Sequence, residues 1–488
     1  MSDPIPPFTA PYAPDETEMV EAMLARNAFD EALEARIQKR AEQFVQGIRE
    51  KSGRAGGAGL EAFMHEYSLS TKEGLALMVL AEALLRVPDA GTQNRLIEEK
   101  LSDGNWTDFD GDENWLIMAA SFGIGMSSWM MQPGETPAAV LRKMGKRVGM
   151  PVIRTGTRQA MHFLGHHFVL GQTIEEGLSR AKKQRAKGFR FSFDMLGEGA
   201  RTTADADKYY AAYAEALNAI GKDAQTRDSQ LPNRPGLSVK LSAIHPRYEA
   251  RQKSRVMREL VPKLLELARQ ARAHELNFTV DAEEADRLEL SLDVFAAVAA
   301  DKSLEGWDGF GLAIQAYQKR APQVIDWVDE LSQRLKRRFM VRLVKGAYWD
   351  TEIKRAQERG IDDFPVFTKK AATDLCYLDC ARKLLAARPR IYPQFATHNA
   401  LSLASILELA GDTEGFEFQR LHGMGETLYD LEMTIEGVPA RIYAPVGGYK
   451  DLLAYLVRRL LENSANSSFV AQVADPDVPM KELLRSPQ

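Results

Sequence analysis

The sequence predicts an α/β fold, a (β/α)8 barrel of the TIM type preceded by an all-helical N-terminal arm and domain. Short apolar or aromatic segments alternate with helical patterns from residue 172 to residue 470, as in a barrel of parallel strands. No strand pattern is visible before that region. A doubly wound sheet is the alternative fold, but no G-x-G-x-x-G follows the first predicted strand.

Length and composition are typical of a soluble protein with more than one domain: 488 residues, 45% hydrophobic and 27% charged. Acidic and basic residues are interspersed at a net charge of -5, so we expect no nucleic-acid partner, which would need a basic stripe. The N-terminus lacks a signal-peptide pattern, and no apolar run reaches the roughly 18 residues of a membrane span. We therefore expect a cytoplasmic protein.

Residues 1–50 are predicted to form the N-terminal arm and residues 51–171 the helical domain. His162 and His166 lie four residues apart on a predicted helix, a spacing that can hold zinc. The glutamate of a metalloprotease motif is missing between them, so we expect no metal there. Cys376 and Cys380 also lie four apart, without a nearby histidine or third cysteine, which favours reduced structural thiols.

Eight segments have the length and composition of strands: 189–196, 237–245, 277–284, 309–317, 340–348, 391–399, 416–424 and 440–447. In such a barrel the functional side chains lie at the carboxyl ends of the strands. Polar residues recur near those ends, namely Asp194, Lys240, Asp281, Gln315, Arg342, Lys345, His398, Gln419, His422 and Tyr443. The basic members predict a positively charged mouth that binds an anionic ligand.

A helix is predicted at residues 449–463, after the last strand, and residues 471–488 form a C-terminal tail. This helix is apolar from Leu452 to Leu461 except for Arg458 and Arg459. Neighbouring side chains on a helix point about 100° apart, so the two arginines cannot share one solvated face. Either this is a surface helix whose arginines snorkel, or it is a lid that offers both guanidiniums to a carboxylate or phosphate.

Several long segments resemble the proline dehydrogenase barrel of the bifunctional proline utilization A flavoproteins, in the order of that family. Among them are LSVKLSAIHPRYE, VRLVKGAYWD, FATHNA and YLVRRLLENSANSSFV. The segment EYSLSTKEGLALMVLAEALLRVPDA resembles the helical domain before that barrel, so the resemblance extends from about residue 50 to about residue 475.

The resemblance implies FAD-dependent oxidation of L-proline to Δ1-pyrroline-5-carboxylate by hydride transfer to the flavin. The electrons would pass to a membrane quinone, which implies peripheral contact with the inner membrane, in the first step of proline catabolism to glutamate. Two alternatives stay open from the residues themselves: a phosphate-binding barrel such as an aldolase or isomerase, and a non-catalytic binding scaffold.

Carried over position by position, the resemblance implies that Lys240, Arg458 and Arg459 bind the substrate carboxylate. The substrate ring would contact Tyr443, Tyr348 and Leu343, while Asp281 and Arg342 would act in catalysis. The FAD-contacting residues would be Ala282, Gln315, Arg342, Lys345, Gly346, Ala347, Thr368, Thr397, His398 and Glu462. No metal is implied.

The chain also departs from the fuller forms of the family. The aldehyde dehydrogenase half is absent from these 488 residues, so we expect a longer natural chain that carries this domain. No ribbon-helix-helix segment begins the chain, and a repressor role is therefore not expected.

Overall fold

The computed structural model describes residues 5–27, 29–52, 169–225, 230–448, 469, 473 and 478–487. The chain divides into two compact units, one of Met1–Phe44, Leu170–Gly447 and Leu484–Gln488 and the other of Val45–Val169 and Gly448–Leu483. The barrel belongs to the first unit. The predictions for residues 53–168, with His162 and His166, and for the helix 449–463, with Arg458, Arg459 and Glu462, lie outside the described residues.

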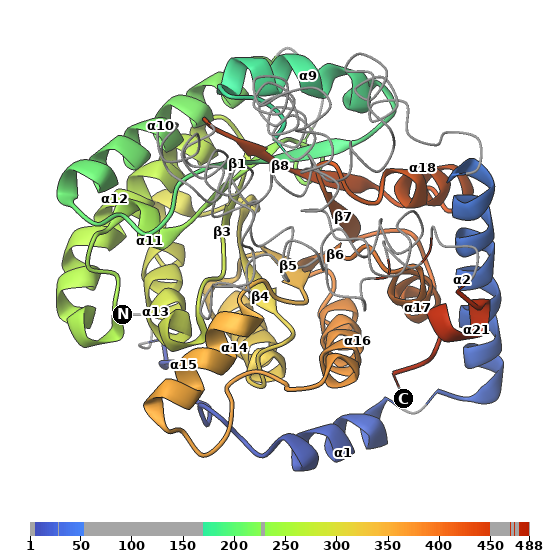
Figure 1. Cartoon of the computed structure of the whole chain (residues 1–488). Helices are drawn as coiled ribbons and strands as arrows, with labels where there is room; N and C mark the ends of the chain where they lie inside the picture. The colour runs from blue at the N-terminus through green and yellow to red at the C-terminus, as the bar shows by residue number, and fades with distance from the viewer. Residues whose placement is uncertain are drawn as a thin grey trace, which may run out of the picture. The chain divides into compact units, whose positions relative to one another are not determined.

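Eight parallel strands close into a barrel in sequence order, which confirms the predicted fold (Figure 1). They are β1 (Arg190–Met195), β2 (Gly236–Val239), β3 (Asn277–Val280), β4 (Phe310–Gln315), β5 (Phe339–Val344), β6 (Ile391–Ala396), β7 (Glu417–Leu421) and β8 (Ala440–Val446). β8 pairs with β1 from Arg190↔Arg441 to Met195↔Val446, and this pairing completes the ring.

Helices surround the strands (Figure 1). They are α9 (Ile174–Ala186), α10 (Thr203–Gln225), α11 (Leu241–Ile244), α12 (Lys253–Ala273), α13 (Leu288–Ala299), α14 (Ala321–Leu335), α15 (Trp349–Arg359), α16 (Lys370–Ala386), α17 (Ala400–Ala410) and α18 (Glu426–Ile435). α12 is a typical amphipathic example, because Val256, Leu260 and Leu264 recur every four residues and are all buried.

The pleat of the strands separates an apolar outer layer from a polar interior. On β1, the rings of Phe191 and Phe193 stack at 5.7 Å, whereas the hydroxyl of the intervening Ser192 lies 3.1 Å from that of Ser238 on β2. Alternation of this kind places polar side chains inside the barrel and aromatic ones against the helices. The interior therefore can hold a buried polar site.

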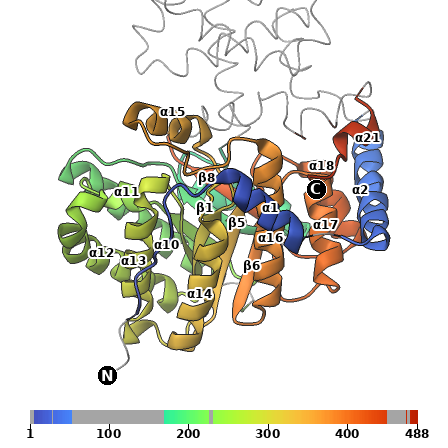
Figure 2. The ribbon, with the colours of Figure 1, turned by 90° about the horizontal axis from the view of Figure 1, so that it is seen from below.

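The N-terminal segment contains the helices α1 (Glu16–Arg26) and α2 (Glu31–Ser52). Figure 2 shows α1 lying across α16. The carbonyl of Pro6 accepts a hydrogen bond from the Trp327 indole at 3.0 Å, and Phe8 packs edge-on against the same ring. Asn27 donates to Asp379 of α16 at 2.8 Å, which fastens the end of α1 to the barrel.

Several predicted strands run past the actual carboxyl ends. The clearest case is the predicted strand 237–245: β2 ends at Val239, and residues 241–244 form the short helix α11, with Lys240 as the N-cap of that helix. The predicted strand 440–447 agrees with β8, and Tyr443 lies within it. The overrun arises because a continuous apolar run does not mark where a strand ends.

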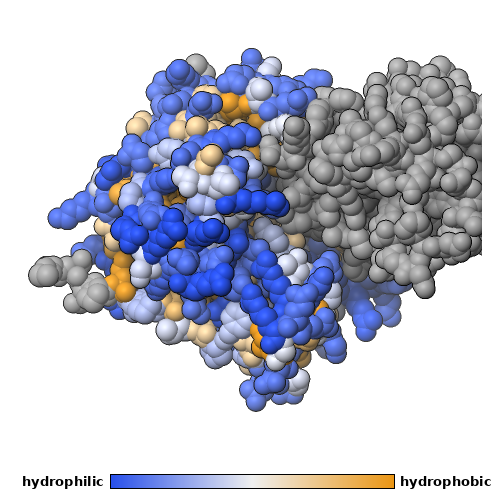
Figure 3. Space-filling view, turned by 60° about the vertical axis from the view of Figure 1, so that its left-hand side comes forward, coloured by the Kyte–Doolittle hydropathy of each residue, from blue (hydrophilic) through white to orange (hydrophobic). Residues whose placement is uncertain are grey.

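The described surface is mostly hydrophilic on the face that Figure 3 shows. The large apolar side chains exposed among the described residues are Leu24, Trp349 and Ile435. No helix in the described part of the chain is both long enough and apolar enough to cross a membrane.

Candidate active site

Four side chains from β1, β8 and the ends of β2 and β3 form one buried cluster. The ammonium of Lys240 lies 2.6 Å from Asp194 Oδ1, 3.4 Å from Asp281 Oδ2 and 3.4 Å from the Tyr443 hydroxyl. Tyr443 donates to Asp281 Oδ2 at 2.7 Å. The structure thus brings together Lys240, Asp281 and Tyr443, as the resemblance implied.

Burial sets the protonation of this cluster. Burial raises the pKa of Asp194, and the nearby charge of Asp281 raises it further. The charge of Lys240 acts in the opposite direction and lowers it. Burial alone would lower the pKa of Lys240, but Asp194, Tyr443 and Asp281 raise it well above its usual range. Burial also raises the pKa of Tyr443, so its hydroxyl keeps the proton that it donates to Asp281.

Arg342 on β5 lies beside this cluster and is held from several strands. Its Nη1 donates to Asp281 Oδ1 at 2.7 Å and its Nε to Gln419 Oε1 at 2.8 Å. Its Nη2 donates to the hydroxyls of Ser192 and Ser238 at 3.1 and 2.9 Å. The guanidinium also lies 4.9 Å from the centre of the Tyr443 ring. Its orientation is therefore fixed by the barrel itself.

A polar column continues from Arg342 toward the amino ends of the strands. Gln419 donates to Glu417 Oε1 at 3.0 Å, and Glu417 binds Arg441 through both carboxylate oxygens at 2.5 and 3.0 Å. Arg190 reaches Glu417 Oε2 at 2.9 Å. Burial by itself raises the pKa of Glu417, but Arg441 and Arg190 bring it below its usual value.

Carboxylates pair with the described cations that were predicted to make the mouth positive. Lys240 pairs with two carboxylates, and Arg342 with Asp281. Lys345 pairs with Asp374 at 2.5 Å. Pairing within the barrel offsets these cations, because an unpaired charge is costly to bury. The contribution predicted for Arg458 and Arg459 lies outside the described residues and stays a prediction.

A second group of cations lies at the amino end of α16. Lys370 reaches Asp374 at 2.7 Å, so one carboxylate holds the ammoniums of both Lys345 and Lys370. Although burial opposes the shift, the two lysines lower the pKa of Asp374. The side chain of Lys369, the N-cap residue of α16, makes no capping hydrogen bond. Two ammoniums beside this helix N-terminus fit the diphosphate of a dinucleotide such as FAD.

Position 346 requires a glycine because its backbone packs directly against a neighbouring aromatic ring. Gly346 has φ +144°, and a Cβ there would lie 2.4 Å from the ring of Tyr317. Ala347 and Tyr348 follow, half-buried, between β5 and α15. Leu343 is fully buried on β5. The contacts predicted for these residues with substrate or cofactor stay predictions.

Three of the predicted FAD contacts bind other parts of the protein. The N–H and hydroxyl of Thr368 both donate to the carboxylate of Glu16, at 2.9 and 3.0 Å. The hydroxyl of Thr397 accepts from Asn399 N at 3.1 Å, and His398 Nε2 accepts from Leu421 N at 3.0 Å. The neutral His398 ring therefore carries its proton on Nδ1. Their FAD contacts stay predictions, and in Thr368 both of these donors are engaged by Glu16.

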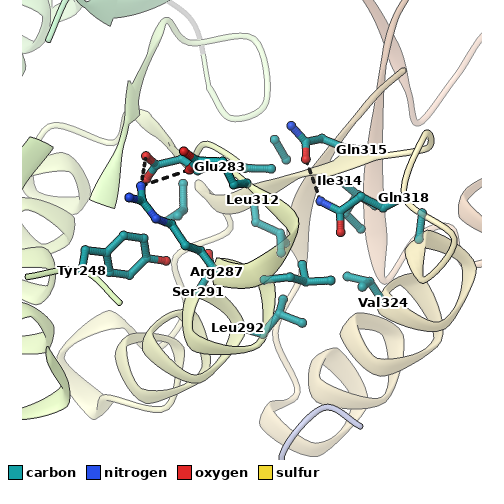
Figure 4. A pocket seen from close by; sticks show the side chains of 16 residues that line it. Tyr248, Glu283, Arg287, Ser291, Leu292, Leu312, Ile314, Gln315, Gln318 and Val324 are labelled. Atoms are coloured by element: carbon teal, nitrogen blue, oxygen red, sulfur yellow. Dashed lines mark hydrogen bonds and ion pairs between the residues drawn. The ribbon is translucent and has the colours of Figure 1, made fainter. Parts of the chain in front are cut away.

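Gln315 and Ala282 line a pocket between β3, β4, α13 and α14 (Figure 4). Gln318, another lining residue, donates its amide to Gln315 Oε1 at 2.8 Å. On the other side of this pocket, Arg287 binds Glu283 at 3.2 Å. Gln315 thus has a fixed partner that the sequence pattern did not suggest.

Sequence reasoning missed several residues that shape the site: Ser192, Ser238, Lys370, Asp374 and Glu417. The alternation of β1 could have indicated Ser192, since it lies two residues before Asp194 and so faces the same side. Asp374 gave a weaker signal. It lies four residues after Lys370, the spacing of a helical ion pair.

Comparison with known protein families identifies the barrel. Residues 177–472 match the family described as "Proline dehydrogenase". Residues 8–49 match "Proline utilization A proline dehydrogenase N-terminal domain", and residues 59–168 match "DNA-binding domain of Proline dehydrogenase". The last match leaves the expectation of no nucleic-acid partner without support.

Known relatives agree with this assignment. The chain is 47% identical to the "Bifunctional protein PutA" of Escherichia coli (strain K12), over 98% of this chain but 37% of the relative. It is 28% identical to "Proline dehydrogenase 1" of Bacillus subtilis (strain 168), over 62% of this chain and 88% of the relative. The chain therefore spans little more than a third of the length of its bifunctional relative.

Solved structures give the same result. A Proline Utilization A (PutA) mutant from Bradyrhizobium japonicum is 59% identical, with a TM-score of 0.76 over 99% of this chain and 48% of that one. PutA from Bdellovibrio bacteriovorus, inactivated by N-propargylglycine, is 26% identical, with a TM-score of 0.72 over 94% of this chain and 44% of that one.

Proposed function

The chain belongs to the proline dehydrogenase family, and from this premise we propose that it oxidises L-proline to Δ1-pyrroline-5-carboxylate with bound FAD. The observation that carries the proposal is the buried ammonium of Lys240, held by Asp194 and Asp281 at the carboxyl end of the barrel. The electrons would pass to a membrane quinone. The reaction would be the first step of proline catabolism to glutamate, carried out in the cytoplasm at the membrane surface.

The substrate carboxylate is proposed to bind Lys240, which its neighbours keep charged. Arg458 and Arg459 would add two guanidiniums from the predicted lid helix. Tyr443 would cover the substrate ring while its hydroxyl stays bound to Asp281. Asp281 pairs with both Lys240 and Arg342, so it holds the two cations in fixed positions relative to each other. Such positioning lowers the barrier by removing freedom of motion before the reaction.

The residues that would hold FAD divide between its diphosphate and its flavin ring. Lys345, Lys370 and the amino end of α16 would bind the diphosphate, and Gln315 and Arg342 would lie at the flavin ring. FAD, when bound, supplies the acceptor for the hydride of the substrate. The protein supplies orientation and excludes water, and none of its side chains needs to be a nucleophile.

The two alternatives lack a specific supporting observation. A sugar-phosphate aldolase or isomerase has no observation of its own in its favour, whereas residues 177–472 match the proline dehydrogenase family. A binding scaffold would not require a buried, hydrogen-bonded network of this extent, because buried polar groups cost stability unless every one is satisfied.

The test is the absorbance spectrum of the purified protein, reconstituted with FAD if it is colourless. We expect flavin bands that bleach on anaerobic addition of L-proline. The Lys240→Met variant is the matched control, because it should show the same bands and bleach only at much higher proline concentration. A folded chain that cannot be loaded with FAD, or flavin that L-proline does not bleach, would overturn the proposal.

A further inference from the structure

We propose that Gln318 is a positioning residue that fixes the side-chain amide of Gln315, so that Gln315 presents its NH2 group to the flavin ring. The inference rests on the proposed binding of FAD. It assigns to Gln318 a role in selecting which polar atom of the flavin is recognised.

Gln315 occupies the place on β4 from which a side chain can reach the mouth of the barrel. It is the last residue of the strand and 4% exposed. Ala313 pairs with Arg342, whose side chain lies inside the barrel. Side chains two apart on a strand face the same way, so Gln315 faces the interior one step closer to the mouth.

Gln318 holds one end of the Gln315 amide. Its Nε2 donates to Gln315 Oε1 at 2.8 Å, and Figure 4 shows the Gln315 nitrogen on the side away from Gln318. The backbone of Gln318 is itself fixed, because its N–H donates to the Gln315 carbonyl at 3.1 Å and it pairs with Val366. An amide has its acceptor at one end and its donors at the other, so this contact leaves the NH2 of Gln315 for a ligand.

The surroundings of Gln318 favour this orientation over the reverse. Gln318 is 3% exposed, and its Oε1 has no hydrogen-bond partner among the described residues. The nearby wall of the pocket is apolar, with Leu312, Ile314 and Val324. If both amides were reversed, two N–H groups of Gln318 would be buried there in place of one carbonyl. Buried N–H groups without partners are rarer than under-satisfied carbonyls, so the reverse orientation is disfavoured.

The orientation matters because the pyrimidine edge of a flavin carries both kinds of group, two carbonyl oxygens and one N–H. A Gln315 NH2 recognises a carbonyl oxygen, whereas a Gln315 oxygen would recognise the N–H. Reduction adds negative charge to the pyrimidine carbonyls. A donor held in place by Gln318 therefore stabilises reduced flavin more than oxidised flavin.

The test reverses the orientation of the Gln315 amide by changing its hydrogen-bond partner, Gln318. In Gln318→Glu, measured at about pH 9.5 so that the buried carboxyl is ionised, the carboxylate can only accept, so it would take the NH2 of Gln315 and turn the Gln315 oxygen to the flavin. We expect FAD to bind the apoprotein about tenfold more weakly or worse, measured by flavin fluorescence quenching, and the bound flavin to become harder to reduce. Gln318→Met, which only releases the amide, should lie between wild type and Gln318→Glu.

A double-mutant cycle separates this role from a merely structural one. In a Gln315→Leu background the amide is gone, so Gln318→Glu should change neither FAD affinity nor potential further. The exposed Gln357→Glu gives the same charge change at the surface and should leave both unchanged. Additive effects, or wild-type affinity and potential in Gln318→Glu, would overturn the inference. Failure of wild-type protein to bind FAD would overturn the proposed function as well.

Discussion

At the scale of single residues, the buried charges of the mouth behave as one group. Lys240 and Arg342 share Asp281, and Asp194 completes a set of two cations and two carboxylates. Removing any one member leaves an uncompensated buried charge, which is more costly than the loss of a single hydrogen bond. Substitutions here should therefore have non-additive effects on stability.

Lys240→Met tests the proposed binding of the substrate carboxylate. The KM for L-proline should rise about ten- to a hundredfold, the loss of one charge-assisted hydrogen bond of roughly 1.5–3 kcal/mol. FAD content, read from absorbance, should stay at the wild-type level. The melting temperature should fall, because Asp194 and Asp281 lose their shared cation. An unchanged KM would remove Lys240 from the substrate site.

The double variant Asp194→Asn with Lys240→Met is the control for charge burial. It removes one cation and one carboxylate, so much of the lost melting temperature should return. The KM should stay high, because the ammonium that binds the substrate is still missing. Recovery of both quantities would show that Lys240 acts through stability alone.

Tyr443→Phe tests whether the hydroxyl of Tyr443 shapes the pocket. The variant loses the 2.7 Å bond to Asp281 and keeps the ring that lies 4.9 Å from Arg342. We expect the ratio of kcat/KM for proline to kcat/KM for hydroxyproline to change more than stability does, since a pocket rejects an added hydroxyl by leaving it unpaired. If the ratio stays constant while the melting temperature falls, Tyr443 belongs to the core and not to the substrate pocket.

The sequence could predict which polar residues gather at the mouth, but not how they pair. Strand ends place Lys240, Asp281 and Tyr443 near one another in any barrel of this kind. Their hydrogen bonds depend on the strand register and on side-chain conformations, which a single sequence does not give. For the same reason the sequence did not reveal that Asp374 on α16 pairs with Lys345.

At the scale of elements, helix α18 is attached to the barrel by Tyr429 and carries a buried carboxyl group, that of Glu432. The Tyr429 hydroxyl shares its one proton between the carbonyls of Thr397 and Gln419, at 2.7 and 3.1 Å, and so joins α18 to β7 and to the residue after β6. Glu432 lies one turn further along and is fully buried. Burial raises the pKa of Glu432 to about 8, so the folded protein keeps this carboxyl protonated near neutral pH.

This proton makes the stability of the protein depend on pH. The unfolded chain releases the Glu432 proton near its ordinary pKa of 4.5, while the folded chain holds it to about pH 8. The contribution of the group is therefore complete at low pH and is lost as pH rises through this window, at up to about 1.4 kcal/mol per pH unit. Glu432→Gln, which cannot ionise, should gain melting temperature relative to wild type between pH 5 and pH 8.

Melting curves at pH 5, 6.5 and 8 check this expectation. Glu358→Gln is the control, because Glu358 is exposed on α15 and the same substitution there should give a constant difference from wild type. A difference between Glu432→Gln and wild type that does not grow with pH would contradict the role of the buried carboxyl.

The sequence predicted elements better than their ends. All eight strands were expected from short apolar runs between helical patterns, yet the segment 241–244 was taken for strand and is helix. Its residues are apolar and buried in either state, so periodicity cannot distinguish the two. The bond between Thr368 and Glu16 was equally hidden, because it joins residues 352 positions apart.

At the scale of the whole barrel, the interior divides into two charged layers joined by Gln419. The layer at the carboxyl ends holds Lys240 and Arg342 with their carboxylates, and the layer at the amino ends holds Glu417 with Arg441 and Arg190. In barrels of this type the carboxyl ends carry catalysis and the amino ends carry stability. Substitutions in the two layers should therefore affect different measurements.

Arg441→Met tests this division at the amino-terminal layer. Arg441 is 1% exposed, and besides binding Glu417 it donates to the carbonyls of Phe191 and Arg234 at 3.1 and 2.9 Å. The bond to Phe191 fastens β8 to β1 where the barrel closes, and the bond to Arg234 holds the segment before β2. Its loss leaves Glu417 with Arg190 as the remaining cation, so the free energy of unfolding in urea should fall by about 3–5 kcal/mol.

The double variant Glu417→Gln with Arg441→Met should recover part of this loss, because it no longer buries a partly compensated carboxylate. The KM for L-proline should stay close to wild type in both variants, in contrast with Lys240→Met, since neither residue belongs to the proposed substrate site. A rise in KM as large as that of Lys240→Met would contradict the division, and would mean that Gln419 transmits the disturbance from Glu417 to Arg342.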